Sequence, residues 1–228
     1  MRRIVDLSQE IYQGMPVHPR HLKTCIFPNL TREDYMAAVG YPFYTRNLLL
    51  NEHGPTHSDA VAEYLADGPT IDLMPFDFFF GDALALDLRS VSPDASIEVR
   101  DLERALEHSG RTADRPARVL LCTGHHRRAY GTAEYLTRYA GLDRAAAEWL
   151  ADRGVINIGI DAPSIDAPGD TAFSGHAVCA ERGITNTEHL CNLEEVVGRR
   201  FLYIGLPLRI RGGTGSPIRA VAVLDDAE

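Results

Sequence analysis

Short apolar runs recur along the chain at intervals that suit alternating strands and helices. Several have the length and composition of buried strands, namely residues 83–88, 118–122, 155–160, 201–204 and 220–224. Between them, residues 99–108 carry apolar side chains at helical spacing, and Asp143 is a predicted N-cap for a helix over residues 144–153. This alternation of strand and helix predicts an α/β architecture.

No internal repeat, low-complexity tract or flexible linker divides the sequence. We therefore expect residues 1–228 to form a single domain. Two segments, residues 161–175 and 212–217, are rich in glycine, proline and small polar residues. Loops of this kind often carry functional groups on a rigid scaffold, so we expect both segments near a functional site.

Composition and charge exclude several classes of protein. The chain is 45% hydrophobic and 24% charged, as is typical of globular domains, and its net charge of -9 opposes binding to nucleic acid. Its apolar runs are far shorter than the ~20 residues of a membrane span, and its start lacks the apolar core of a secretory signal. The four cysteines are scattered without a CxxC pair, which predicts reduced thiols and a cytoplasmic protein.

The densest group of metal-binding side chains is His53, His57, Asp59 and Glu63. Glycine and proline directly after His53 oppose a helix there, whereas residues 59–65 are good helix formers, so we expect a helix to begin near residues 56–59. Asp59 and Glu63 would then share one helical face. Imidazoles and carboxylates without cysteine favour a catalytic zinc, manganese or ferrous ion over a structural zinc site.

Simpler explanations exist for the same residues. Thr56 and Asp59 have the spacing of a helix capping box, which would leave the histidines without a functional role. His176, at the start of a plausible short helix, and Glu188 form a second pair beyond the loop at 161–175. A buried carboxylate at Glu188 would need a cation or hydrogen-bond donors, although single residues of these types are more often structural.

Several motifs nevertheless match one family in order along almost the whole chain. They are Asp6-Leu7-Ser8, Gly14-Met15-Pro16, His53-x-x-x-His57-x-Asp59, Thr123-Gly124, the segment Gly159 to Asp166, His176 followed by Glu188, and Gly215-Ser216-Pro217-x-Arg219-Ala220. Together they resemble the cyclase family that includes bacterial kynurenine formamidases and isatin hydrolases.

This resemblance implies a metal site at His53, His57 and Asp59, with His176 and Glu188 as further ligands or acid–base groups. It also implies a compact α/β fold with a mixed, barrel-like β core flanked by helices, and a homodimer or homotetramer. The family motif usually has a histidine at the position of Glu63. Glu63 can still bind a metal but adds negative charge, so we expect one or two divalent ions, zinc or manganese.

The resulting hypothesis is hydrolysis of an amide, cyclic amide or imide, or related C–N bond by metal-activated water, with Glu63, His176 and Glu188 as catalytic residues. We expect His125, Arg127 and Ser164 to contact a small-molecule substrate, although residues 125–130 also suit a solvated loop or a helix start. The alternatives are a metal-dependent cyclisation, dehydration or isomerisation, and a metal-binding protein without activity.

Overall fold

The computed structural model describes residues 2–225, and its contacts divide the chain into two units. One unit comprises Met1–Gln9 and Glu52–Glu228, and the other is the segment Glu10–Asn51 between them. Every predicted site residue belongs to the first unit. A single domain over residues 1–228 stays a prediction.

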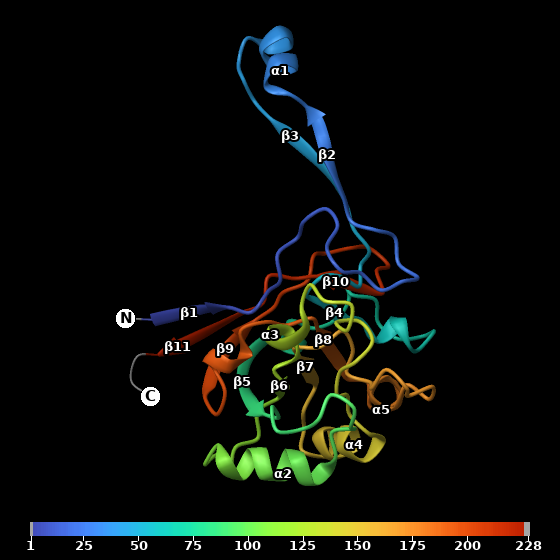
Figure 1. Cartoon of the computed structure of the whole chain (residues 1–228), viewed down its shortest axis with the longest axis vertical. Coiled ribbons are helices and arrows are strands. Elements are labelled where there is room, and N and C mark those ends of the chain that lie inside the picture. The colour runs from blue at the N-terminus through green and yellow to red at the C-terminus, as the bar shows by residue number, and fades with distance from the viewer. Residues whose placement is uncertain (1, 226–228) are drawn as a thin grey trace. The chain divides into compact units, whose positions relative to one another are not determined.

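A nine-stranded mixed sheet forms the centre of the larger unit (Figure 1). In spatial order its strands are β1 (Arg2–Asp6), β11 (Val221–Asp225), β9 (Arg200–Ile204), β5 (Phe80–Asp87), β6 (Arg118–Cys122), β7 (Asn157–Ile160), β8 (Thr185–Glu188), β4 (His57–Asp59) and β10 (Gly215–Pro217). The central strands β5, β6, β7 and β8 are parallel, and the remaining pairs are antiparallel. The sheet curls into a half-barrel, which confirms the predicted α/β fold with a mixed, barrel-like core.

Helices connect the parallel strands, as parallel pairing requires. They are α2 (Val99–His108), α3 (His125–Ala129), α4 (Arg144–Asp152) and α5 (Ser174–Arg182). The predicted cap of α4 is confirmed, because the Asp143 carboxylate accepts the N–H of Ala146 at 2.7 Å. Among residues 2–225, every helix is too short or too polar to cross a membrane.

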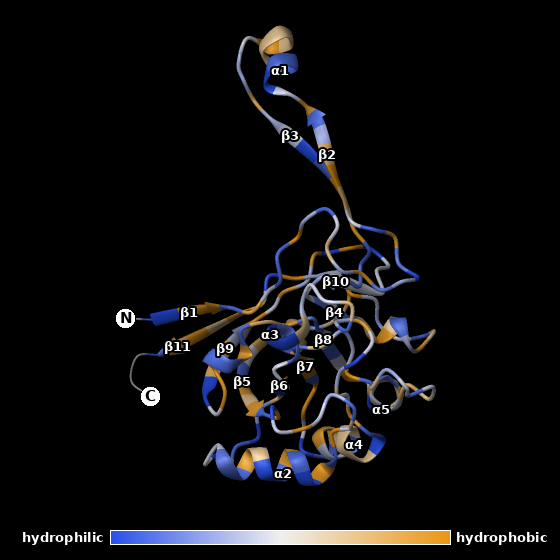
Figure 2. Cartoon of the chain, viewed as in Figure 1, coloured by the Kyte–Doolittle hydropathy of each residue, from blue (hydrophilic) through white to orange (hydrophobic). Residues whose placement is uncertain are grey.

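Both faces of the central strands are buried, which explains their nearly continuous apolar sequences. Along β5, Leu84 and Leu86 join a cluster that includes Leu102 of α2, whereas Ala83 and Ala85 join a second cluster on the opposite face. Figure 2 shows hydrophobic residues along the inner strands and hydrophilic bands along α2. The sheet therefore gives the loops at its ends a rigid support.

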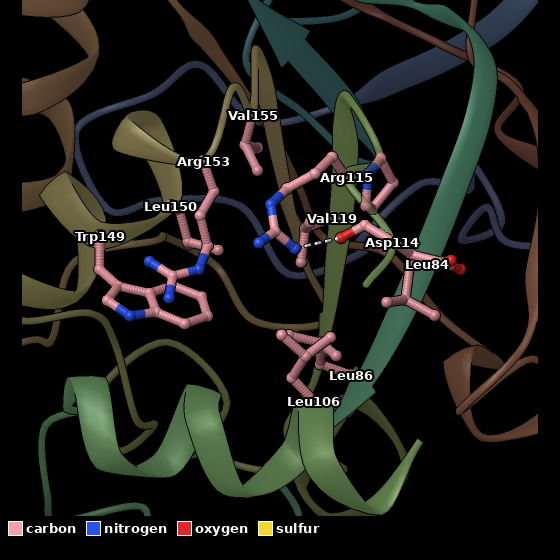
Figure 3. A pocket seen from close by; sticks show the side chains of 11 residues that line it. Leu84, Leu86, Leu106, Asp114, Arg115, Val119, Trp149, Leu150, Arg153 and Val155 are labelled. Atoms are coloured by element: carbon pink, nitrogen blue, oxygen red, sulfur yellow. Dashed lines mark hydrogen bonds between the residues drawn. The ribbon is translucent and has the colours of Figure 1, made fainter. Parts of the chain in front are cut away.

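A small cavity lies where α2, α4 and β5 meet (Figure 3). The guanidinium of Arg153 stacks 3.4 Å from the ring centroid of Trp149 at its wall, and Leu84, Leu86 and Leu106 line it. Its volume of about 20 Å³ has room for one water molecule. This cavity is too small for a substrate.

The segment Glu10–Asn51 forms a hairpin of β2 (Cys25–Leu30) and β3 (Thr45–Leu49), connected through α1 (Arg32–Val39). A capping box of Thr31 and Asp34 begins the helix, and Gly40 ends it with a φ of 71°. None of the α1 residues is buried. Large apolar side chains of this unit are exposed, among them Phe27, Met36, Tyr41, Phe43 and Leu48.

The prediction of a helix over residues 59–65 is wrong. Residues His57–Asp59 form strand β4, paired with β8 and β10, and only the short 3-10 turn Val61–Glu63 follows. The capping box at Thr56 is also absent, because this hydroxyl accepts the backbone N–H of Gln9 and donates to the carbonyl of His189. Strand pairing in a buried position outweighs the helix propensity of the segment.

Candidate metal centre

Strand β4 aims two metal-binding side chains in the same direction. Residues two apart on a strand share one face, so His57 and Asp59 point to the same side and Ser58 to the other. Ser58 there hydrogen-bonds the hydroxyl of Thr187 at 2.7 Å. In the antiparallel register with β8, His57 lies directly opposite Glu188. The pairing thus brings together residues that are far apart in the sequence.

His53 reaches this group from the loop before β4. Its Nδ1 lies 2.8 Å from an oxygen of Asp59, and its Nε2 lies 2.9 Å from the hydroxyl of Thr214. Glu52 accepts both the backbone N–H and the hydroxyl proton of Thr214, which fixes that loop. At Gly215 an added Cβ would lie 2.7 Å from the His53 ring, so the loop packs closely on this histidine. The segment 212–217, whose second half is strand β10, therefore supports the centre, as the sequence predicts.

His176 enters from the first turn of α5, as expected from the sequence. Its Nε2 lies 3.6 Å from an oxygen of Asp59 and 3.6 Å from one of Glu188. Its Nδ1 donates to Asp166, which also accepts the backbone N–H of Gly175. The carboxylate of Asp166 fixes the ring and leaves Nε2 directed at the other metal-binding groups.

The donor atoms form two groups that share one residue. His53, His57 and Asp59 make the first group, and Asp59, His176 and Glu188 make the second. Within each group the donor atoms lie within 4.8 Å of one another. Glu63 lies at the edge, with an oxygen 3.5 Å from Nδ1 of His53. The structure brings together all six residues that the sequence analysis selects as metal ligands.

Charge in this cluster is unevenly distributed. Burial opposes ionisation of Asp59, but hydrogen bonds from His176, His53 and His57 hold its pKa well below the usual value. Burial and the negative charge of Asp59 raise the pKa of Glu188, and the same two causes raise the pKa of Glu63 to about 10. Three carboxyl groups in so small a volume favour a compensating cation. Together with three imidazoles, they fit a divalent metal ion.

A cavity of about 390 Å³ opens beside the cluster. Glu63, Ser164 and His176 line it together with Phe173, which is 61% exposed. A volume of this size suits a small organic molecule. The predicted substrate contact Ser164 thus lies next to two of the predicted metal ligands.

The other two predicted substrate contacts lie outside the cluster. His125 is buried, its Nε2 donates to the carbonyl of Tyr135, and its Nδ1 accepts from Arg128. Arg127 is on the surface, where it pairs with Glu194 at 3.6 Å. Residues 125–129 form helix α3, in agreement with the alternative of a helix start.

Asp166 and Thr214 support His176 and His53, and the sequence alone predicts no role for either residue. Both stand in segments that are expected near the site. The available signal was the rule that a metal-binding histidine usually donates its second nitrogen to an oxygen of the protein. That rule predicts such a partner but does not identify it without coordinates.

The chain is similar to several known proteins over nearly its whole length. A family model described as "Putative cyclase" matches residues 5–167. A kynurenine formamidase of Delftia acidovorans is 31% identical over 227 residues, covering 96% of this chain and 97% of that protein. Isatin hydrolase A of Ralstonia solanacearum is 25% identical, with a TM-score of 0.83 over 98% of this chain and 92% of that one. An isatin hydrolase bound to the product analogue thioisatinate has the same fold at 21% identity, with a TM-score of 0.86 over 99% and 93% of the two chains. The chain therefore belongs to the cyclase family.

Proposed function

We propose that this protein is a metal-dependent hydrolase of a non-peptide C–N bond in an amide, a cyclic amide or an imide. One observation carries the proposal: two groups of metal-binding side chains share Asp59 and border a cavity large enough for a small organic substrate. The similarity to a kynurenine formamidase and to isatin hydrolases supports the same class of reaction.

The donor set supports one or two divalent ions, zinc or manganese. His53 and His57 with Asp59 would hold one ion, and His176 and Glu188 with Asp59 a second. A bound ion supplies Lewis acidity, which acidifies water and polarises a carbonyl group. Imidazole with carboxylate oxygen suits both metals, and the absence of sulfur ligands favours an open catalytic site over a closed structural one.

The remaining chemistry belongs to side chains around the cavity. Glu63 borders it and is one-third exposed, so its carboxyl group is placed to pass a proton to a leaving nitrogen. His176 and Glu188 are further candidates for proton transfer at the same site. The hydroxyl of Ser164 is placed to hydrogen-bond a polar group of the substrate.

Metal analysis of the purified protein, combined with hydrolysis assays, tests this proposal. The substrates are N-formyl aromatic amines, cyclic imides and lactams. Products whose combined mass exceeds that of the substrate by one water distinguish hydrolysis from cyclisation or isomerisation. We expect His57→Ala and Asp59→Ala to lose both bound metal and turnover. Ser58→Ala, on the opposite face of the same strand, is the control and keeps both. Full metal content and activity in the His57 or Asp59 variant would refute the site.

We also propose a homodimer or homotetramer in the cytoplasm. The many exposed apolar side chains of the Glu10–Asn51 unit support association, because such a surface is unfavourable in water. The four free thiols support a reducing compartment. Light scattering of the full chain would measure the oligomeric state.

A further inference from the structure

A row of buried polar side chains leads from Gln9 to His189 beside the metal centre. The side-chain amide of Gln9 donates to the hydroxyl of Tyr135 at 2.5 Å, and this hydroxyl lies 2.8 Å from Nδ1 of His189. Thr56 links the two ends, because its hydroxyl accepts the backbone N–H of Gln9 and donates to the backbone carbonyl of His189. The reaction proposed above gives no role to this row.

The direction of these hydrogen bonds selects the tautomer of His189. The Tyr135 hydroxyl has a single proton, and its oxygen already accepts the N–H of Gln9. Within the part of the chain that the structure describes, residues 2–225, the only other hydrogen-bond partner of this hydroxyl is Nδ1 of His189, so the proton goes to that nitrogen. In a neutral imidazole with Nδ1 as acceptor, the ring proton is on Nε2.

The second ring nitrogen of His189, Nε2, is open to hydrogen bonding. Among residues 2–225 no group hydrogen-bonds this nitrogen, and it is not one of the buried polar atoms without a partner, so it retains solvent access. His189 as a whole is only 6% exposed, and its ring centroid lies 5.8 Å from that of His57. An available N–H donor therefore lies next to a metal-binding residue.

The backbone holds His189 in an unusual conformation. Its φ of 58° is in the left-handed region, which residues with a side chain rarely adopt. Besides the bond from Thr56 to its carbonyl, its N–H donates to the carbonyl of Ala162 at 2.9 Å. Such conformations persist where surrounding contacts fix them, and they are concentrated at functional sites.

We propose that His189 binds the substrate through Nε2–H, as a neutral hydrogen-bond donor to the carbonyl oxygen that gains negative charge during hydrolysis. Tyr135 and Gln9 are positioning residues that hold the ring in this tautomer. The inference rests on the proposed function. A donor already in place needs no reorganisation as charge develops, and removal of one such donor typically lowers kcat by about 10²–10³-fold.

The tautomer is measured without substrate, by NMR of metal-free protein labelled with ¹⁵N-histidine. The His189 signals are those missing from His189→Asn, a variant chosen because asparagine tolerates the left-handed region. We expect a protonated Nε2 and an unprotonated Nδ1 in the wild type. In Tyr135→Phe we expect the proton to be shared between both nitrogens. Tyr139→Phe, which removes a hydroxyl from a neighbouring ring that also packs on His125, keeps the wild-type pattern.

Kinetics with any substrate of the panel that the wild type hydrolyses complete the test. We expect His189→Asn to lower kcat by about 10²–10³-fold at unchanged metal content, and Tyr135→Phe to give a smaller fall. A proton on Nδ1 in the wild type, or unchanged kinetics in His189→Asn, would overturn this inference and leave the proposed function intact. A wild type that binds metal but hydrolyses none of the panel would overturn both.

Discussion

Replacement of Asp166 by asparagine tests how the protein orients His176, a proposed metal ligand. The two oxygens of this carboxylate accept different hydrogen bonds, one from the backbone N–H of Gly175 and one from Nδ1 of His176. Asparagine has a single acceptor oxygen, so in either orientation of its amide one of the two bonds is lost. If the amide nitrogen faces His176, it also favours the tautomer in which Nε2 carries the proton and cannot bind a metal.

The expected loss follows from that change. Removing the hydrogen-bond partner of a metal-binding histidine typically weakens metal affinity by about 10–100-fold, which equals about 1.4–2.8 kcal/mol. We expect Asp166→Asn to bind zinc more weakly by this factor. Competition between the metal-free protein and a chromophoric chelator of known affinity measures it, and no substrate is needed.

Asp170→Asn is a closely matched control. The two oxygens of Asp170 accept the backbone N–H groups of Ala172 and Ser174 at the same end of α5, so asparagine again loses one of two bonds. Asp170 contacts no residue of the metal centre through these bonds. We therefore expect the zinc affinity of Asp170→Asn to be close to that of the wild type. Equal zinc binding in Asp166→Asn and the wild type would refute the reasoning, as would an equal loss in both variants.

Two further predictions concern stability. Gly159→Ala places a Cβ 2.2 Å from Cδ2 of Leu120, so we expect it to lower the free energy of unfolding by about 1–3 kcal/mol. Leu120→Ala should lower it by about 2–5 kcal/mol. The double variant should lose less than the sum, because the truncated side chain at position 120 leaves room for the new Cβ. Urea unfolding of the metal-free proteins measures all three losses, and strict additivity would contradict the packing. Asp143→Ala removes the cap of α4 and should cost about 1 kcal/mol, which lowers Tm by about 2–4 °C in calorimetry. An unchanged Tm would show that the cap is unimportant.

Where local sequence dominates, the predicted elements agree with the structure. Helix α2 and strand β6 have the predicted bounds, and α4 begins at its predicted cap. Apolar spacing and capping residues act within a few positions of the chain, so they can be read without coordinates. The hairpin at Glu10–Asn51 was not predicted, because its apolar side chains are largely exposed and follow no clear one-sided pattern.

The metal centre, likewise, is only partly predictable from the sequence. The types and spacing of His53, His57 and Asp59 identify metal-binding chemistry, but the local structure predicted for them was a helix. A three-residue strand such as β4 has too little intrinsic preference to be recognised by itself, and its pairing with β8 stabilises it. His53, His57 and Asp59 therefore do come together, but through strand pairing and not through the predicted helix.

The sequence by itself determined the fold class, most of the buried strands and the candidate metal ligands, because each depends on composition, spacing or motifs. Tertiary structure decided which of these side chains meet. The register of β4 against β8 sets His57 opposite Glu188, α5 brings His176 to Asp59, and Tyr135 selects the tautomer of His189. These relations join segments far apart in the chain, and the free energy that fixes them comes from packing and hydrogen bonds that form only in the folded protein.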